Sequence, residues 1–143
     1  MNKEQFKHKI NIKVRFSDLD AMQHVNNATY LTYLEEARIE YFNKIFDRSK
    51  SDLNFQAVVG KIEISYLYPI ELGDDVEVYT RVSKLGNKSA DVEHLIAVKK
   101  GNKIINSAES ITKLVFYDYK NKTTKLIPEE VKQIIKKFEG LEQ

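Results

Sequence analysis

The stretch ATYLTYLEEARIEYFNKIF, residues 28–46, decides the fold. It contains neither Gly nor Pro, and its apolar residues recur at steps of three and four, the spacing of one helix face. We therefore expect one helix of about five turns, roughly 28 Å long at 1.5 Å per residue. Its apolar positions are Tyr30, Leu34, Ala37, Tyr41 and Ile45, widened by Leu31, Tyr33, Ile39, Phe42 and Phe46. So broad an apolar surface requires a sheet that wraps around much of the helix.

Five stretches alternate apolar and polar residues, which is the period-two pattern of half-buried strands. The first runs from Ile10 to Phe16, before the helix. The others follow at 62–68, 76–82, 90–98 and 104–117, and short turns between them predict an antiparallel meander of these four strands. A last stretch, PEEVKQIIKKF at 128–138, places Pro128 at the first helical position and predicts a short terminal helix.

The predicted fold class is therefore α+β, an antiparallel sheet of about five strands around one long helix. The chain has 143 residues, a length that one domain over 1–143 accounts for. It has no cysteine, which excludes disulfides, a thiolate nucleophile and cysteine-ligated metal sites. Its net charge of +2 favours neither nucleic acid nor a membrane surface as a partner. No apolar run is long enough for a membrane span, and we expect a cytoplasmic protein.

The junction between the first strand and the long helix gathers Asp18, Asp20, His24, Asn26 and Asn27. Two explanations are open from the residues alone. Asp and Asn favour turns and helix N-caps, so they could serve only local hydrogen bonding. Alternatively, a carboxylate before a helix start lies near free backbone N–H groups and the positive end of the helix dipole, an arrangement suited to acyl transfer.

Two motifs carry a family resemblance. They are SDLDAMQHVNNATYL at 17–31 and, more loosely, SYLYPIELGDDVEVYTRV at 65–82, with its Tyr-x-x-Pro and a following Gly-Asp turn. In these the chain resembles the hotdog-fold acyl-CoA thioesterases of the 4-hydroxybenzoyl-CoA thioesterase family, over roughly residues 8–120. The resemblance implies a hotdog fold, hydrolysis of an acyl thioester to a carboxylic acid and CoA, and no cofactor.

The resemblance also assigns roles at the junction. The second acid of the Asp-x-Asp pair, here Asp20, serves as general base or nucleophile, and Asp18 is structural. The backbone N–H of Asn27, seven positions later, polarises the thioester carbonyl. Both requirements follow from the chemistry, because the attacking water must lose a proton and negative charge grows on the carbonyl oxygen.

The role of His24 is less determined. The string His-Val-Asn-Asn is similar to the active-site segment of plant-type acyl-ACP thioesterases, where an Asn two residues before the His joins the acid. Met22 occupies that position here, so His24 is expected to contact substrate or support the acid. We expect Asn26 to cap the helix.

Substrate contacts are expected at residues outside the junction loop. Tyr30 and Tyr66 are candidates for the wall of an acyl tunnel. In the reversal KLGNKSA, 84–90, Lys88 and Ser89 are candidates for binding the CoA phosphates, although a Lys-rich hairpin is also an ordinary solvated turn.

Other catalytic classes fit less well. Asp18, Asp20 and His24 are ligand types for divalent metals, but His8 and His94 stand alone and no second cluster exists, so we expect no metal. The five glycines form no Gly-x-Ser-x-Gly motif and no phosphate-binding loop.

Three rival functions remain open from the sequence: an acyl-ACP thioesterase, a hotdog hydratase or dehydratase that would use His24, and a non-catalytic acyl-thioester binding protein. Loss of an enoyl-CoA without thiol release would select the hydratase, and binding of CoA without turnover would select the binding protein. A curved sheet with an unpaired edge favours association, so we expect a homodimer or homotetramer.

Overall fold

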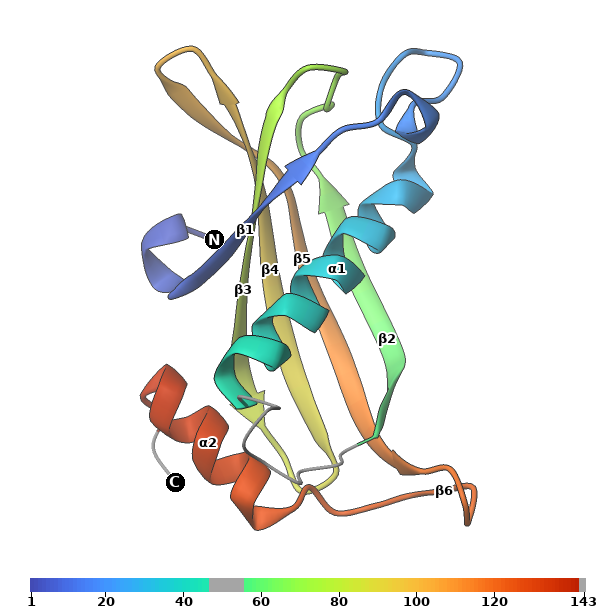
Figure 1. Ribbon diagram of the computed structural model, residues 1–143, viewed down its shortest axis with the longest axis vertical. Coiled ribbons are helices and arrows are strands. Elements are labelled where there is room, and N and C mark those ends of the chain that lie inside the picture. Colours follow the sequence, from blue (N-terminus) through green and yellow to red (C-terminus); the bar gives the residue numbers. More distant parts are fainter. Residues whose placement is uncertain (47–55, 142–143) are drawn as a thin grey trace.

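The computed structural model describes residues 1–46 and 56–141, in which an antiparallel sheet surrounds one long helix (Figure 1). The strands are β1 (His8–Lys13), β2 (Ala57–Tyr66), β3 (Asp75–Leu85), β4 (Ser89–Lys100), β5 (Lys103–Asp118) and the short β6 (Thr123–Thr124). The helices are α1 (Asn27–Phe46) and α2 (Glu129–Glu139), with 3-10 turns η1 (Lys3–Gln5) and η2 (Phe16–Asp18). The predicted α+β architecture is confirmed.

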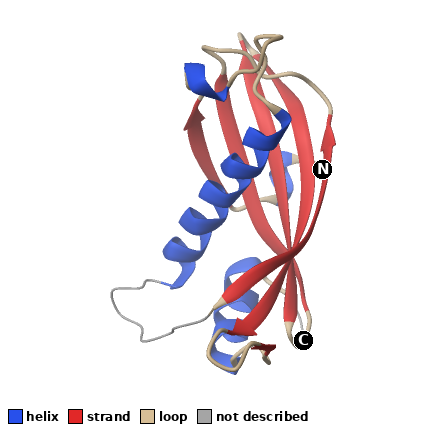
Figure 2. Ribbon diagram, turned by 90° about the vertical axis from the view of Figure 1, so that its right-hand side faces the viewer, coloured by secondary structure: helices blue, strands red, loops and turns tan. Residues whose placement is uncertain are grey.

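Helix α1 lies against the concave face of the sheet, which curls around it (Figure 2). Leu34, Ala37 and Tyr41, spaced three and four residues apart, are fully buried. This spacing places them on one face of the helix, and the hydrophobic effect holds that face against the sheet. The helix predicted at 28–46 is confirmed, with its start one residue earlier at Asn27.

The strand order differs from the predicted meander. The order is β1-β3-β4-β5-β2, so only β3, β4 and β5 are consecutive neighbours, and β2 pairs with β5 instead of β3. The turn at 71–74 closes locally through an Asp74 N–H to Glu71 O hydrogen bond of 3.2 Å, as a hairpin turn would. The preceding segment, however, buries Ile70 completely in the core beneath α1. The connection between β2 and β3 is therefore a crossover on the helix side of the sheet.

The first strand is shorter than predicted. It ends at Lys13, and Phe16, expected on the buried face, is 80% exposed. The carboxylate of Asp18 accepts a hydrogen bond from the Arg15 N–H at 3.0 Å, and the Asp18 N–H donates to Arg15 O at 2.9 Å. These local bonds form η2 in place of a continued strand, because short polar side chains compete with ladder hydrogen bonds.

The core beneath α1 has two apolar halves. The first surrounds the N-terminal half of the helix and includes Leu34, Val78 and Ile96, and the second surrounds its C-terminal half and includes Phe42, Val82 and Val92. Helix α2 completes the second half with Val131 and Ile135, two positions of the predicted stripe. Pro128 lies at its N-cap, one position before the predicted one.

The opposite face of the sheet carries the N-terminal segment. Phe6 packs on Tyr79 with ring centroids 5.9 Å apart, and the Met1 amino group lies 2.7 Å from the Glu109 carboxylate. In the described part of the chain, neither helix is long and apolar enough to cross a membrane.

Candidate functional site

The junction between η2 and α1 is a tight closed loop. Leu19 and Val25 pair in an antiparallel bridge, and the Asp20 N–H donates to His24 O at 2.8 Å. Gln23 closes the turn with a φ of 64°, a left-handed conformation that is uncommon for residues other than Gly. The polar residues predicted from the motif therefore lie within one compact loop before the helix.

The crossover holds this loop in place. The Val25 N–H donates to Ile70 O at 2.8 Å, and His24 pairs with Glu71 in a second bridge. Ile70 and Glu71 are far from the loop in sequence, and no local pattern predicts these contacts. The second motif, which contains both residues, is thus part of the same site as the first.

Asp18 is the buried acid of the pair. Its carboxylate accepts bonds from the Arg15 guanidinium at 2.9 and 3.2 Å and from the Tyr33 hydroxyl at 2.8 Å. Burial opposes ionisation, but the hydrogen bonds from Arg15 and Tyr33 together lower the pKa of Asp18 below its usual value. The structure thus gives Asp18 the structural role predicted for it. Tyr33 and Arg15 were not predicted as its partners.

Asp20 is the exposed acid. Its Oδ1 accepts a hydrogen bond from the Met22 N–H at 2.9 Å, with the His24 N–H at 3.5 Å. Among the described residues no donor to Oδ2 is recorded. One oxygen therefore fixes the carboxylate in the loop, and the other is available to a water molecule or a substrate.

The start of α1 supplies a free donor. Asn26 is the N-cap as predicted, because its Oδ1 accepts the Ala28 N–H at 2.8 Å and its main-chain oxygen accepts the Thr29 N–H at 2.9 Å. The Asn26 N–H donates in turn to Asp18 O at 2.9 Å. The N–H of Asn27 has no recorded acceptor in the described part of the chain. It is therefore an unused donor at the positive end of the helix dipole.

The two predicted tyrosines lie beside this helix start. The Tyr66 hydroxyl donates to Asn27 O at 3.0 Å, and its ring meets the Tyr30 ring edge-to-face with centroids 5.0 Å apart. Tyr30 is buried, which raises the pKa of its hydroxyl, and hydrogen bonds with Ser107 and the Ile70 backbone oppose that rise. The structure thus brings Asp20, His24, Asn27, Tyr30 and Tyr66 to one end of the sheet.

Lys88 and Ser89 lie elsewhere. The turn between β3 and β4, to which they belong, is at the opposite end of the sheet from the junction (Figure 1). Ser89 O accepts the Gly86 N–H at 2.8 Å, and Lys88 Nζ lies 3.5 Å from Thr124 Oγ1. Within one copy of the chain, these two residues cannot reach a substrate carbonyl held near Asp20.

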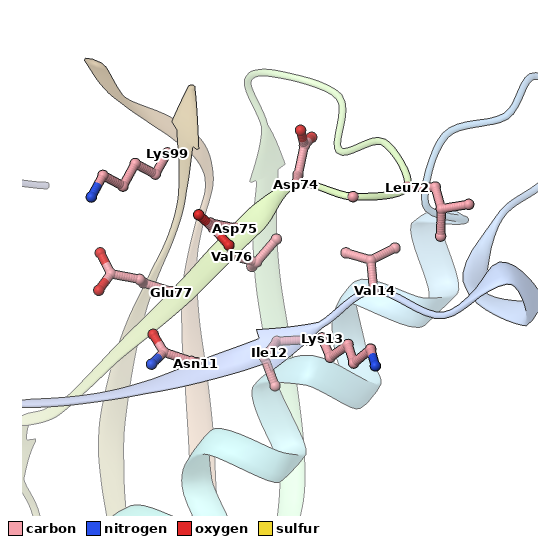
Figure 3. Close-up of a pocket in the computed structure, with 11 residues that line it drawn as sticks. Asn11, Ile12, Lys13, Val14, Leu72, Asp74, Asp75, Val76, Glu77 and Lys99 are labelled. Atoms are coloured by element: carbon pink, nitrogen blue, oxygen red, sulfur yellow. The ribbon is translucent and has the colours of Figure 1, made fainter. Parts of the chain in front are cut away.

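A pocket of about 730 Å³ lies along β1 and the start of β3 (Figure 3). Asp74, Asp75 and Glu77 give it an acidic wall, and Lys13 and Lys99 also line it. Asp74 is paired with Lys100 at 2.6 Å, and Glu77 with Lys9 at 2.6 Å. None of the predicted site residues lines this pocket, so we place the candidate site at the junction and not here.

Metal ligation has no support in the side-chain geometry. Within residues 1–46 and 56–141, no group of three or more His, Asp or Glu side chains is arranged to hold an ion. Asp18, one of the three sequence candidates, instead uses its carboxylate oxygens for Arg15 and Tyr33.

Comparison with known proteins agrees with the motif. Residues 14–135 match the family model of the thioesterase-like superfamily. The chain is 31% identical over 123 residues to the long-chain acyl-CoA thioesterase FadM of Escherichia coli (strain K12), covering 85% of this chain and 92% of that protein.

Solved structures show the same relationship. A thioesterase from Thermus thermophilus, complexed with coenzyme A and Zn, superposes with a TM-score of 0.83 and 34% identity over 98% of this chain and 99% of that chain. A mutant 4-hydroxybenzoyl CoA thioesterase complexed with 4-hydroxybenzoyl CoA has a TM-score of 0.80 over 90% of this chain and 97% of that chain. Its 15% identity supports the fold alone. The predicted hotdog fold and the predicted class, a thioester hydrolase, are confirmed: this chain belongs to the thioesterase-like superfamily.

Proposed function

We propose that this protein is an acyl-CoA thioesterase, which hydrolyses an acyl thioester to a free carboxylic acid and CoA. The similarity to FadM supports an acyl-CoA substrate, and the coenzyme A bound to the Thermus thermophilus thioesterase supports CoA as the carrier. The single observation that carries the proposal is at the junction. There the loop presents an open carboxylate oxygen on Asp20, and the helix start presents an unused N–H on Asn27.

The chemistry assigned to these groups is as follows. The Asn27 N–H donates to the thioester oxygen and stabilises the negative charge that forms there. Asp20 either removes a proton from the attacking water or attacks the carbonyl itself to form a mixed anhydride that water then hydrolyses. In both routes the C–S bond breaks, and the CoA thiolate leaves and takes up a proton. The two routes stay as alternatives.

The remaining predicted residues contact the substrate. His24, beside Asp20 in the loop, orients the carboxylate or the substrate. Tyr30 and Tyr66 form part of the wall for the acyl group. Lys88 and Ser89 bind the nucleotide phosphates, and because they lie at the far end of the sheet, they would do so from a second copy of the chain.

A homodimer or homotetramer is therefore part of the proposal. The outer edge of β2 is free in a single chain, and Val59 and Tyr66 on this strand are each 44% exposed. Pairing with a second copy would cover such an edge. A cytoplasmic location stays a prediction.

The test is thiol release from a panel of acyl-CoAs, from short to long and from aliphatic to aromatic. The wild type should release thiol, and Asp20→Asn should lose several orders of magnitude in kcat. Asp75→Asn, at an exposed Asp outside the junction, is the matched control and should keep full activity. Absence of turnover with every acyl-CoA and every acyl-ACP would contradict the proposal, and equal rates in wild type and Asp20→Asn would remove Asp20 from it.

A further inference from the structure

A row of polar side chains crosses the middle of the concave face beneath α1. The strand register pairs His8 with Thr80, Thr80 with His94, and His94 with Ser110, so the four lie side by side on β1, β3, β4 and β5. All four are buried. The row falls between the two apolar halves of the core, and neither half includes any of its members.

Arg38 brings a positive charge to this row from the helix. It lies between Ala37, in the first half of the core, and Tyr41, in the second, and its side chain is 8% exposed. No hydrogen bond or ion pair of Arg38 is recorded among residues 1–46 and 56–141. Glu35, one turn earlier on the helix, is the carboxylate that acts on it electrostatically, and Glu35 is exposed to solvent.

The unsatisfied polar atoms of the described core gather in the same layer. They are His8 Nδ1, Arg38 Nη1, His94 Nε2, Ser110 Oγ and Thr112 Oγ1. Thr112 follows Ser110 on the same face of β5. Buried polar groups in proteins nearly always have a hydrogen-bond partner. Neighbouring side chains that are all unsatisfied, and that do not bond one another, indicate a shared partner between them.

The chemistry of these groups specifies the partner. A guanidinium is permanently charged and only donates hydrogen bonds, and hydroxyl groups can donate as well. His94 Nδ1 lies 3.0 Å from Thr80 Oγ1, so a proton from Thr80 to Nδ1 leaves Nε2 as a donor. Burial keeps this imidazole neutral, because it lowers the pKa of His94 to about 3. A water molecule would satisfy the donors but would leave the charge of Arg38 uncompensated, whereas a doubly charged anion would exceed it.

We propose that this layer binds one small monovalent anion of the chloride class between Arg38 Nη1, His94 Nε2 and the hydroxyls of Ser110 and Thr112. The anion compensates the buried arginine and links α1 to the centre of the sheet. The site is distinct from the junction with Asp20 and does not depend on the proposed reaction.

Bromide, a heavier ion of the same class, gives a direct test. Crystals grown in sodium bromide should show an anomalous bromine peak within contact distance of Arg38 Nη1 and His94 Nε2. Absence of that peak, a water in its place, or a carboxylate of a second copy bound to Arg38 would overturn the proposal.

A solution experiment tests the same site with variants. At constant ionic strength, replacing gluconate by chloride should raise the Tm of the wild type and should not raise that of Arg38→Met. Arg81→Met, which removes a guanidinium paired with Glu93 on the other face, is the matched control and should keep the chloride response. If Arg38→Met does not fold, Ser110→Ala retains the charge and should weaken the response. An equal chloride response in all these proteins would count against the site.

Discussion

The Tyr66 hydroxyl donates a hydrogen bond to the main-chain oxygen of Asn27, 3.0 Å away. Tyr66 is the last residue of β2 and Asn27 is the first residue of α1, so the bond ties the edge strand to the helix start. The ring of Tyr30 supports the ring of Tyr66 through an edge-to-face contact. The strand thereby determines where the first helical turn, with its unused N–H, lies.

Tyr66→Phe keeps the ring and removes this bond. We expect kcat for acyl-CoA hydrolysis to fall about tenfold, which corresponds to about 1.4 kcal/mol of transition-state stabilisation, with little change in KM. Steady-state thiol release measures both. Tyr117→Phe, whose ring contacts Tyr119 at 5.2 Å, is the control and should be fully active. A raised KM with unchanged kcat would instead assign Tyr66 to substrate binding.

Asp18→Asn should reduce stability without removing a reacting group. The buried carboxylate serves Arg15 and Tyr33, and its loss should lower the free energy of unfolding by about 1–3 kcal/mol. Because the folded pKa of Asp18 is lowered, the charged form stabilises the fold above the unfolded-state pKa of about 4. This contribution disappears as the pH falls through the folded pKa. Urea unfolding should show the difference from wild type at pH 7 and its decrease below about pH 4; a constant difference would contradict the assignment.

Tyr41 joins α1 to the terminal helix. Its hydroxyl donates to the Glu139 carboxylate, which also accepts the Val82 N–H at 3.1 Å. Burial and the neighbouring carboxylate raise the pKa of Tyr41, so the unfolded state loses the phenolic proton at lower pH than the folded state. Stability should therefore decrease as the pH rises above about 10. Tyr41→Phe should cost about 1–3 kcal/mol at pH 7. It should also show a weaker decrease at alkaline pH, as chemical denaturation can measure.

His94 should make the protein sensitive to mild acid. Its imidazole is fully buried, which lowers its pKa to about 3, so between that value and about 6.5 the unfolded state binds a proton that the folded state does not. The free energy of unfolding should therefore fall by up to about 1.4 kcal/mol per pH unit as the pH decreases below about 6.5. His94→Gln should show a shallower dependence. His24→Gln, in the loop, should keep the wild-type slope, and identical slopes in all three proteins would exclude His94 as the cause.

Local patterns predict the elements of this fold better than their pairing. The helix at 28–46 follows from spacing alone, because one apolar face is repeated over its whole length. The partner of β2 does not, because the turn at 71–74 has the residues of a hairpin. Its neighbour Ile70 is instead buried under α1 and carries the chain across the sheet. Pairing therefore depends on a long-range contact.

The site divides in the same way. Asn26 as a cap and Asp18 as a structural acid follow from residue types next to a helix start. The separation of Lys88 and Ser89 from the junction depends on strand lengths and order, which a motif does not specify. Arg38 occupies a core-facing helical position, but its lack of a partner emerges only once His94 and Ser110 are placed beneath it.

The bond from the Val25 N–H to Ile70 O has a consequence for folding kinetics. It joins the loop before α1 to a crossover that follows β2, so the loop reaches its final shape only after distant parts of the chain meet. Contacts of this kind form slowly, because loop-closure entropy opposes them. During refolding, helical circular dichroism should therefore recover first, and thioesterase activity should return with the slowest phase.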